Sequence, residues 1–165
     1  MSDTDNPRIG LASDHAGYEM KECIRGLLDK KGIPFIDYGT YTTDRVNYAN
    51  YGHKLAEAIE KGEVSAGIAV CGSGNGINMT LNKHAAIRSA LCWNEAITEL
   101  ARAHNNANVL ALPGRFLSMD AVEKMVDTFL NTPFEGGRHQ QRIEAIPISP
   151  AVDGRTHMPP ISGSV

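Results

Sequence analysis

Residues 66–76 read Ala66-Gly67-Ile68-Ala69-Val70-Cys71-Gly72-Ser73-Gly74-Asn75-Gly76. The first six form a short apolar run, which is typical of a strand that is buried on both faces of a parallel sheet. The next five contain three glycines, which indicates a tight turn. A predicted helix then continues through Asn82. The stretch therefore predicts a buried strand that passes through a glycine turn directly into a helix.

The same alternation of strand and helix extends to both sides of this stretch. Gly32 and Gly62 are expected to end two helices, and Ser118 to cap another, because these residue types satisfy the free groups at helix ends. The other strands are predicted at 8–13, 34–38, 90–93 and 109–112, and the other helices at 17–31, 50–61, 94–104, 118–130 and 137–145. This order predicts an α/β, Rossmann-like fold, a doubly wound five-stranded parallel sheet with helices on both faces.

Length and composition are those of an ordinary globular domain. The chain has 165 residues, of which 42% are hydrophobic and 21% charged, and this length is sufficient for one domain with its own core. We expect the domain to span residues 1–148. Residues 149–165 are rich in Pro, Gly and Ser and have no periodicity, so we expect a disordered tail.

Charge and cysteine usage disfavour several classes of partner. The formal net charge of -3, without a cluster of Lys and Arg, argues against nucleic acid and membrane surfaces. The first residues lack the features of a signal peptide and no apolar run could span a bilayer, so we expect a cytoplasmic protein. The three cysteines form no CxxC pair, so no disulfide or zinc site is predicted. Cys23 and Cys92 are expected to lie in the core.

Ligands of open parallel sheets bind at the carboxyl ends of the strands. The residues that follow the five predicted strands are Asp14-His15, Gly39-Thr40, Cys71 with its glycine turn, Trp93-Asn94 and Gly114-Arg115. A carboxylate, an imidazole, a thiol and a guanidinium are thus expected at one edge of the sheet. Together they indicate a reaction site more strongly than any one of them alone.

Cys71 is the first candidate for chemistry. Its sulfur can face the positive N-terminal end of the following helix, which favours a reactive thiolate. Successive N–H groups of turn 72–76 can form a nest for an oxyanion. The alternative is that Cys71 is a small buried apolar residue and that the glycines only shape a turn. Nucleotide binding is disfavoured, because the last glycine of a dinucleotide fingerprint and the Lys of a P-loop are absent.

The remaining polar candidates each have a structural alternative. Asp14 can be only an N-cap of the first helix, and His104 only a cation that suits the last turn of its helix. Tyr48 alone indicates little. Arg138 and Arg142 are four residues apart on a predicted helix, and the face that they share suits either solvent or a phosphate.

Taken together, several motifs are similar to those of one family. They extend over positions 8 to 148 and are Ser13-Asp14-His15-Ala16-Gly17, Tyr38-Gly39-Thr40, Cys71-Gly72-Ser73-Gly74-Asn75-Gly76, Ala103-His104-Asn105-Asn106-Ala107-Asn108-Val109, Gly114-Arg115 and Gly136-Gly137-Arg138-His139-Gln140-Gln141-Arg142. In this combination the chain resembles the type B ribose-5-phosphate isomerases, within the wider family that includes galactose-6-phosphate and allose-6-phosphate isomerases.

The resemblance implies a mechanism of proton transfer without metal or cofactor. Cys71 corresponds to the base that moves a proton between C2 and C1, and the N–H groups of turn 72–76 correspond to the donors that stabilise the enediolate oxygen. His104 corresponds to the histidine that helps to open the furanose ring, with the Ser73 hydroxyl nearby. Some members use instead a glutamate just after the glycine turn, where this chain has Ile77.

The resemblance also implies a substrate site and an assembly. Asp14, Tyr48 and Asn105 correspond to residues that bind sugar hydroxyls. Members are generally dimers, so we expect a homodimer with active sites shared between subunits, or a tetramer. Ser73 stands where many members have threonine, which keeps the hydroxyl and removes a methyl group. The residues that correspond to the phosphate site are His15, Arg115, Arg138 and Arg142.

The expected activity is the interconversion of ribose 5-phosphate and ribulose 5-phosphate, a step of the pentose phosphate pathway. Two alternatives remain open. An isomerase of allose 6-phosphate or galactose 6-phosphate would use the same chemistry and differ only in the room for the sugar. A non-catalytic sugar-phosphate sensor would keep the arginines but would not need a thiol, an oxyanion loop and a histidine together.

Overall fold

The computed structural model describes residues 8–148, in which strands and helices alternate as the sequence predicts. The predicted tail at 149–165 lies outside the described residues. The strands are β1 (Ile9–Ser13), β2 (Phe35–Asp37), β3 (Ala66–Cys71), β4 (Ser89–Leu91) and β5 (Val109–Pro113), and the helices are α1 (Tyr18–Lys31), α2 (Tyr48–Glu60), α3 (Asn75–Leu81), α4 (Glu95–Ala103), α5 (Met119–Asn131) and α6 (Arg138–Glu144).

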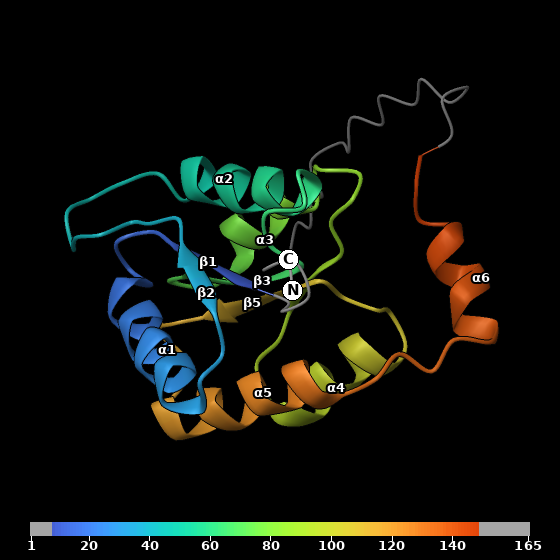
Figure 1. The fold of residues 1–165 in the computed structure, drawn as a ribbon. Helices are drawn as coiled ribbons and strands as arrows, with labels where there is room; N and C mark the ends of the chain where they lie inside the picture. Colours follow the sequence, from blue (N-terminus) through green and yellow to red (C-terminus); the bar gives the residue numbers. More distant parts are fainter. Residues whose placement is uncertain (1–7, 149–165) are drawn as a thin grey trace, which may run out of the picture.

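The five strands form one parallel sheet in the order β2-β1-β3-β5-β4. The chain moves one way along the sheet from β1 to β2 and from β4 to β5, and the other way from β2 through β3 to β4. Because parallel crossovers are right-handed, these two directions place their helices on opposite faces. Figure 1 shows α1, α4 and α5 on one face and α2 and α3 on the other. The predicted doubly wound fold is confirmed.

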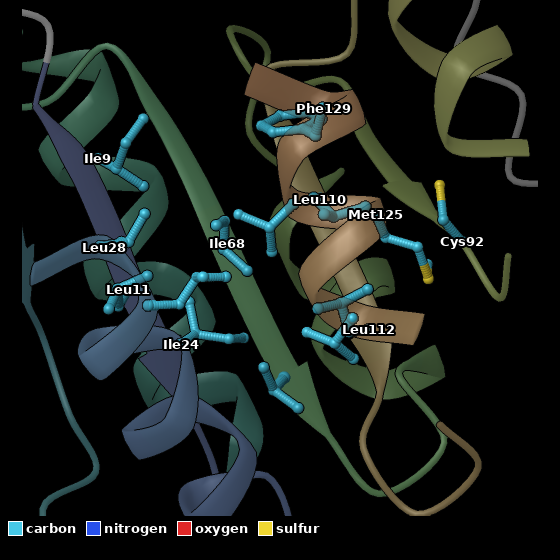
Figure 2. Packing of buried hydrophobic residues seen from close by; sticks show 14 of the residues in the cluster. Ile9, Leu11, Ile24, Leu28, Ile68, Cys92, Leu110, Leu112, Met125 and Phe129 are labelled. Carbon is cyan, nitrogen blue, oxygen red and sulfur yellow. The ribbon is translucent and has the colours of Figure 1, made fainter. Parts of the chain in front are cut away.

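Each face of the sheet has its own hydrophobic core. In the core under α1 and α5, side chains of β1, β3 and β5 meet those of the two helices (Figure 2). Leu55 of α2 and Ile77 and Leu81 of α3 fill the core on the other face. Burial of a side chain of this size stabilises the folded state by about 1.5–3 kcal/mol relative to leaving it exposed to water. The residues labelled in Figure 2 are Ile9, Leu11, Ile24, Leu28, Ile68, Cys92, Leu110, Leu112, Met125 and Phe129.

Local capping determines where most helices begin and end. Gly32 ends α1 with φ 67, and the side chains of Asn94 and Ser118 accept hydrogen bonds at the starts of α4 and α5. These three ends agree with the sequence prediction. Helix α2 begins at Tyr48 rather than at Asn50, because Asn47 accepts a hydrogen bond from the Ala49 N–H.

Lys21 is the largest departure from the apolar pattern of α1. Its side chain is completely buried, and its Nζ lies 2.6 Å from Oδ2 of Asp37 at the end of β2. The other oxygen of Asp37 accepts the Gly39 N–H at 2.9 Å. The ion pair therefore joins α1 to the segment that leaves β2, a link that helical periodicity did not indicate.

The two cysteines expected in the core differ. Cys92 is buried as predicted, whereas Cys23 is exposed, so that prediction was wrong. Consecutive residues of a helix are about 100° apart, and Ile24 is the neighbour that faces the sheet.

Within residues 8–148, no helix is long and apolar enough to cross a membrane.

Candidate active site

The candidate site begins between β1 and β3, whose following helices leave toward opposite faces of the sheet. Cys71 ends β3 and is 4% exposed. Asp14 follows β1, and its backbone N–H donates to the Val70 carbonyl at 3.3 Å, so its position beside β3 is fixed. Its Oδ1 accepts the Gly17 N–H at 3.0 Å. Asp14 therefore caps the start of the α1 region and also lies at the edge where Cys71 ends.

The glycine turn after Cys71 requires its glycines. Gly74 has φ 75, and a Cβ there would lie 2.5 Å from Cδ1 of Leu91. The Ser73 hydroxyl accepts the Asn75 N–H at 3.3 Å, which holds the turn at the start of α3. Within residues 8–148, the N–H groups of Ser73 and Gly74 donate no hydrogen bond. The turn thus leaves these backbone N–H groups to bind an anion, in agreement with the predicted nest.

Arg115 lies against the glycine turn. The Gly114 N–H donates to the Cys71 carbonyl at 2.9 Å, and the Arg115 N–H donates to the Gly72 carbonyl at 3.1 Å. A Cβ on Gly72 would be 3.2 Å from Nη1 of Arg115, so the guanidinium packs over this glycine. The end of β5 thereby places a cation over the glycine turn that follows Cys71.

His15 is oriented by the segment before α2. Its Nδ1 accepts the Val46 N–H at 3.2 Å, so the proton of the neutral ring is on Nε2, where it can be donated to a ligand. His15 and Arg115 both line a cleft of about 530 Å³. An imidazole donor and a guanidinium on one cleft suit a phosphate group.

Tyr48 lies over the glycine turn. It is the first residue of α2 and is 42% exposed. A Cβ on Gly76 would lie 2.4 Å from Cζ of the tyrosine, so the ring rests directly on that glycine. The structure therefore gathers Asp14, His15, Tyr48, Cys71, turn 72–76 and Arg115 at the carboxyl edge of the sheet.

His104 and Asn105 lie at the opposite edge. They follow α4 and lead into β5, so they belong to the amino edge of the parallel sheet. The neighbouring Asn108 carbonyl accepts the Gly67 N–H at 2.9 Å, which places this segment beside the start of β3. A strand of five residues is roughly 16 Å long. Within one chain, His104 is therefore about one strand length from Ser73, whereas the resemblance implies that the two lie near each other in a site shared between subunits.

Arg138 and Arg142 belong to this second group. Both are exposed on α6, which projects away from the sheet (Figure 1). The ring of His139, between them on the same helix, stacks on the ring of His104 at a centroid distance of 4.1 Å and an angle of 11°. This stacking brings α6 to the end of α4.

Sequence reasoning assigned no role to His139 or Glu135. His139 is 5% exposed, and its Nε2 lies 3.4 Å from Oε2 of Glu135; the same oxygen is 3.8 Å from Nε2 of His104. Burial is the main cause that lowers the pKa of His139, followed by the charges of His104 and Arg138. The one sequence feature that could have pointed to His139 is its position inside the motif at residues 136–142, next to Arg138.

Comparisons with known proteins agree with the fold and with the motifs. The model of the family described as Ribose/Galactose Isomerase matches residues 9–146. Ribose-5-phosphate isomerase B of Escherichia coli K12 is 40% identical over 139 residues, which are 84% of this chain and 93% of that protein.

Solved structures support the same relationship. A ribose 5-phosphate isomerase of Thermotoga maritima superposes with a TM-score of 0.83 at 45% identity, over 84% of this chain and 96% of that one. The Mycoplasma genitalium ribose-5-phosphate isomerase B with bound ribulose-5-phosphate gives 0.80 at 39% identity, over 84% and 93%. The chain therefore belongs to the ribose/galactose isomerase family.

Proposed function

We propose that this protein interconverts ribose 5-phosphate and ribulose 5-phosphate. The observation that supports this most strongly is the buried Cys71 thiol beside a glycine turn whose Ser73 and Gly74 N–H groups donate no hydrogen bond within residues 8–148, in a chain 40% identical to a ribose-5-phosphate isomerase B. A base and an oxyanion site next to each other are what an enediolate reaction needs. The catalytic free thiol also favours a reducing compartment, the cytoplasm.

Each residue at the carboxyl edge has a step in this reaction. The Cys71 thiolate removes the proton from C2 of the open-chain aldose, and the electron pair moves to the C1 carbonyl oxygen. The N–H groups of turn 72–76 stabilise the resulting enediolate. The thiol then returns the proton to C1, while the proton of the C2 hydroxyl moves to the C1 oxygen, so that the C2 oxygen becomes the carbonyl and the C1 oxygen becomes a hydroxyl. Asp14 and Tyr48 hold sugar hydroxyls, and His15 and Arg115 hold the phosphate.

The second group of residues supports a homodimer with shared sites. His104 and Asn105 lie about one strand length from Cys71 in the same chain, so we place them, with Arg138 and Arg142, in the active site of a second subunit. There His104 opens the furanose ring and Asn105 binds the sugar. Exposed apolar side chains such as Trp93 (57%) and Phe116 (76%) offer contact surface for such an assembly.

Mixed dimers test the shared site. Cys71→Ala and His104→Ala chains, each inactive alone, are co-refolded, and turnover of ribose 5-phosphate is measured. Each heterodimer then has one site with both lesions and one with neither, so activity recovers to about a quarter of the wild-type value for random pairing. A mixture as inactive as its parents would contradict the proposal. The control pairs Cys71→Ala with Arg115→Ala, whose lesions both lie on the carboxyl edge. Each site of this heterodimer then carries one lesion, so we expect no more activity than the Arg115→Ala protein has alone.

A substrate comparison tests the activity itself. With ribose 5-phosphate and a chelator present, we expect ketose formation, because the proton transfer uses a thiol and backbone donors. With allose 6-phosphate we expect a much lower kcat/KM. Turnover of the hexose alone would favour a hexose-phosphate isomerase, and binding without any turnover would favour the sensor.

A further inference from the structure

Three side chains at the amino edge of the sheet form a compact group. The proposed isomerase mechanism uses His104 alone and gives the group as a whole no role. His104 ends α4, Glu135 precedes α6 and His139 lies on α6. The Glu135 N–H donates to the Ala103 carbonyl at 3.0 Å, so the backbone holds the carboxylate beside His104. One nitrogen from each histidine and one carboxylate oxygen all lie within 4.8 Å of one another.

One polar atom of this group lacks a partner. His139 is 5% exposed, and its Nε2 is fully buried and makes no hydrogen bond within the described residues. Oε2 of Glu135 lies 3.4 Å away but not in hydrogen-bonding geometry. Leaving a buried polar atom unsatisfied costs about 1–3 kcal/mol. A ligand that binds this nitrogen would remove the cost, and the nitrogen faces the carboxylate.

The spacing suits a transition-metal ion. Ligands at about 2.0–2.2 Å from a tetrahedral Zn²⁺ are roughly 3.4 Å from one another. The two distances to Oε2 of Glu135 are 3.4 Å from His139 and 3.8 Å from His104. Two imidazoles and a carboxylate favour zinc-like ions over Mg²⁺, which prefers oxygen ligands.

We propose that His104, Glu135 and His139 bind a zinc-like divalent cation, and that the bound ion inhibits isomerisation by occupying the imidazole of His104. The inhibitory half rests on the proposed role of His104 in ring opening. An imidazole whose Nε2 coordinates a metal can neither donate nor accept a proton at that atom. The cluster is thus an inhibitory metal site on an enzyme whose chemistry needs no metal.

Two features of the group shape its affinity. The stacked rings are nearly parallel, so their lone pairs converge only after one ring rotates, and the His104 side chain, which is 36% exposed, has more room than that of His139. Arg138 and Arg142 on α6 oppose a cation, whereas Glu135 attracts it.

Metal binding is measured directly on chelator-treated full-length protein. Zn²⁺ is titrated by calorimetry, and Co²⁺ by its visible absorption, which reports tetrahedral coordination by nitrogen and oxygen. We expect one ion per chain in the wild-type protein. In Glu135→Gln and His139→Gln the affinity should fall at least about 10-fold, because even outer-shell partners of a metal contribute 10–100-fold.

A matched control uses the other histidine pair of the protein. His53 Nδ1 lies 2.7 Å from His84 Nε2, and His84 Nδ1 lies 3.1 Å from Glu60 on the opposite side of the sheet. Since this group is already paired internally, His53→Gln should leave the affinity for Zn²⁺ unchanged. Cys71→Ala should also keep the bound ion, whereas loss of binding in that variant would assign the metal to the thiol and overturn the proposal.

Inhibition is then measured as the isomerisation rate with metal relative to the metal-free rate of the same variant. Zn²⁺ should inhibit the wild-type and His53→Gln enzymes, with relief by chelator, and Mg²⁺ should have no effect. Inhibition that is equally strong in Glu135→Gln, binding that persists in His139→Gln, or stoichiometric binding without inhibition would each overturn the proposal. If the protein does not isomerise ribose 5-phosphate at all, the calorimetric and Co²⁺ measurements still test the metal site, so the two failures are distinguishable.

Discussion

Replacement of Cys71 with alanine is expected to lower kcat for ribose 5-phosphate by about 10³-fold or more, since the variant lacks the base of the proposed proton transfer. Binding should persist, because His15, Arg115 and the N–H groups of turn 72–76 remain in place. The methyl group of alanine fits the buried position, where Cys71 is 4% exposed. Turnover is followed as ketose formation, and binding by calorimetry with the substrate.

Cys92→Ala is the matched control for this experiment. Cys92 is also a free buried cysteine, and burial raises the pKa of its thiol, so it remains protonated in the core under α5. We expect kcat to stay near the wild-type value and stability to fall slightly. If Cys71→Ala kept wild-type turnover, Cys71 would not be the base, and another group at the carboxyl edge would have to move the proton.

Gly17→Ala is expected to destabilise the protein by about 3 kcal/mol or more, because an overpacked site that cannot shift costs more than an ordinary core change. A Cβ at this position would lie 2.3 Å from the Val70 carbonyl oxygen and 2.6 Å from its carbon. The obstacle is the backbone of the central strand β3 rather than a flexible side chain. The change would push the start of α1 away from β3, and with it Asp14, whose Oδ1 accepts the Gly17 N–H.

Gly26→Ala tests the same substitution inside α1, the helix that Gly17 precedes, with the opposite expected sign. Gly26 lies inside α1, and nothing is within 4 Å of its added Cβ. Alanine there should stabilise the protein by about 0.5–1 kcal/mol through helix propensity. Urea unfolding curves of the two variants compare their free energies of unfolding. Equal midpoints for both variants would contradict the close approach of α1 to β3.

The order of strands and helices could be predicted from the sequence because its signals are local. Apolar runs such as 66–71 and caps such as Asn94 and Ser118 depend only on residues close in the chain. The same approach gave no account of Lys21. Its burial depends on Asp37, which is distant in sequence and meets it only when α1 packs beside β2.

The carboxyl-edge part of the candidate site could also be predicted, since the fold class alone determines which side of the sheet the residues after each strand reach. Asp14, Cys71 and Arg115 lie there as expected. The separation of His104 from Ser73 could have been predicted from the order of the elements, because a residue between a helix and the next strand lies at the amino edge of a parallel sheet. The resemblance instead suggested that the two lie together, and we propose that they do so across the two chains of a dimer.

The sequence by itself determined the fold class, the family resemblance and the residues that carry it, because periodicity, caps and motifs are properties of short stretches. Only the tertiary structure decided that Tyr48 rests on Gly76, that Arg115 covers Gly72 and that His139 stacks on His104. These contacts join residues from different elements, and their distances follow from how helices pack on a twisted sheet. Packing of that kind depends on all the side chains at once, so no single stretch of sequence encodes it.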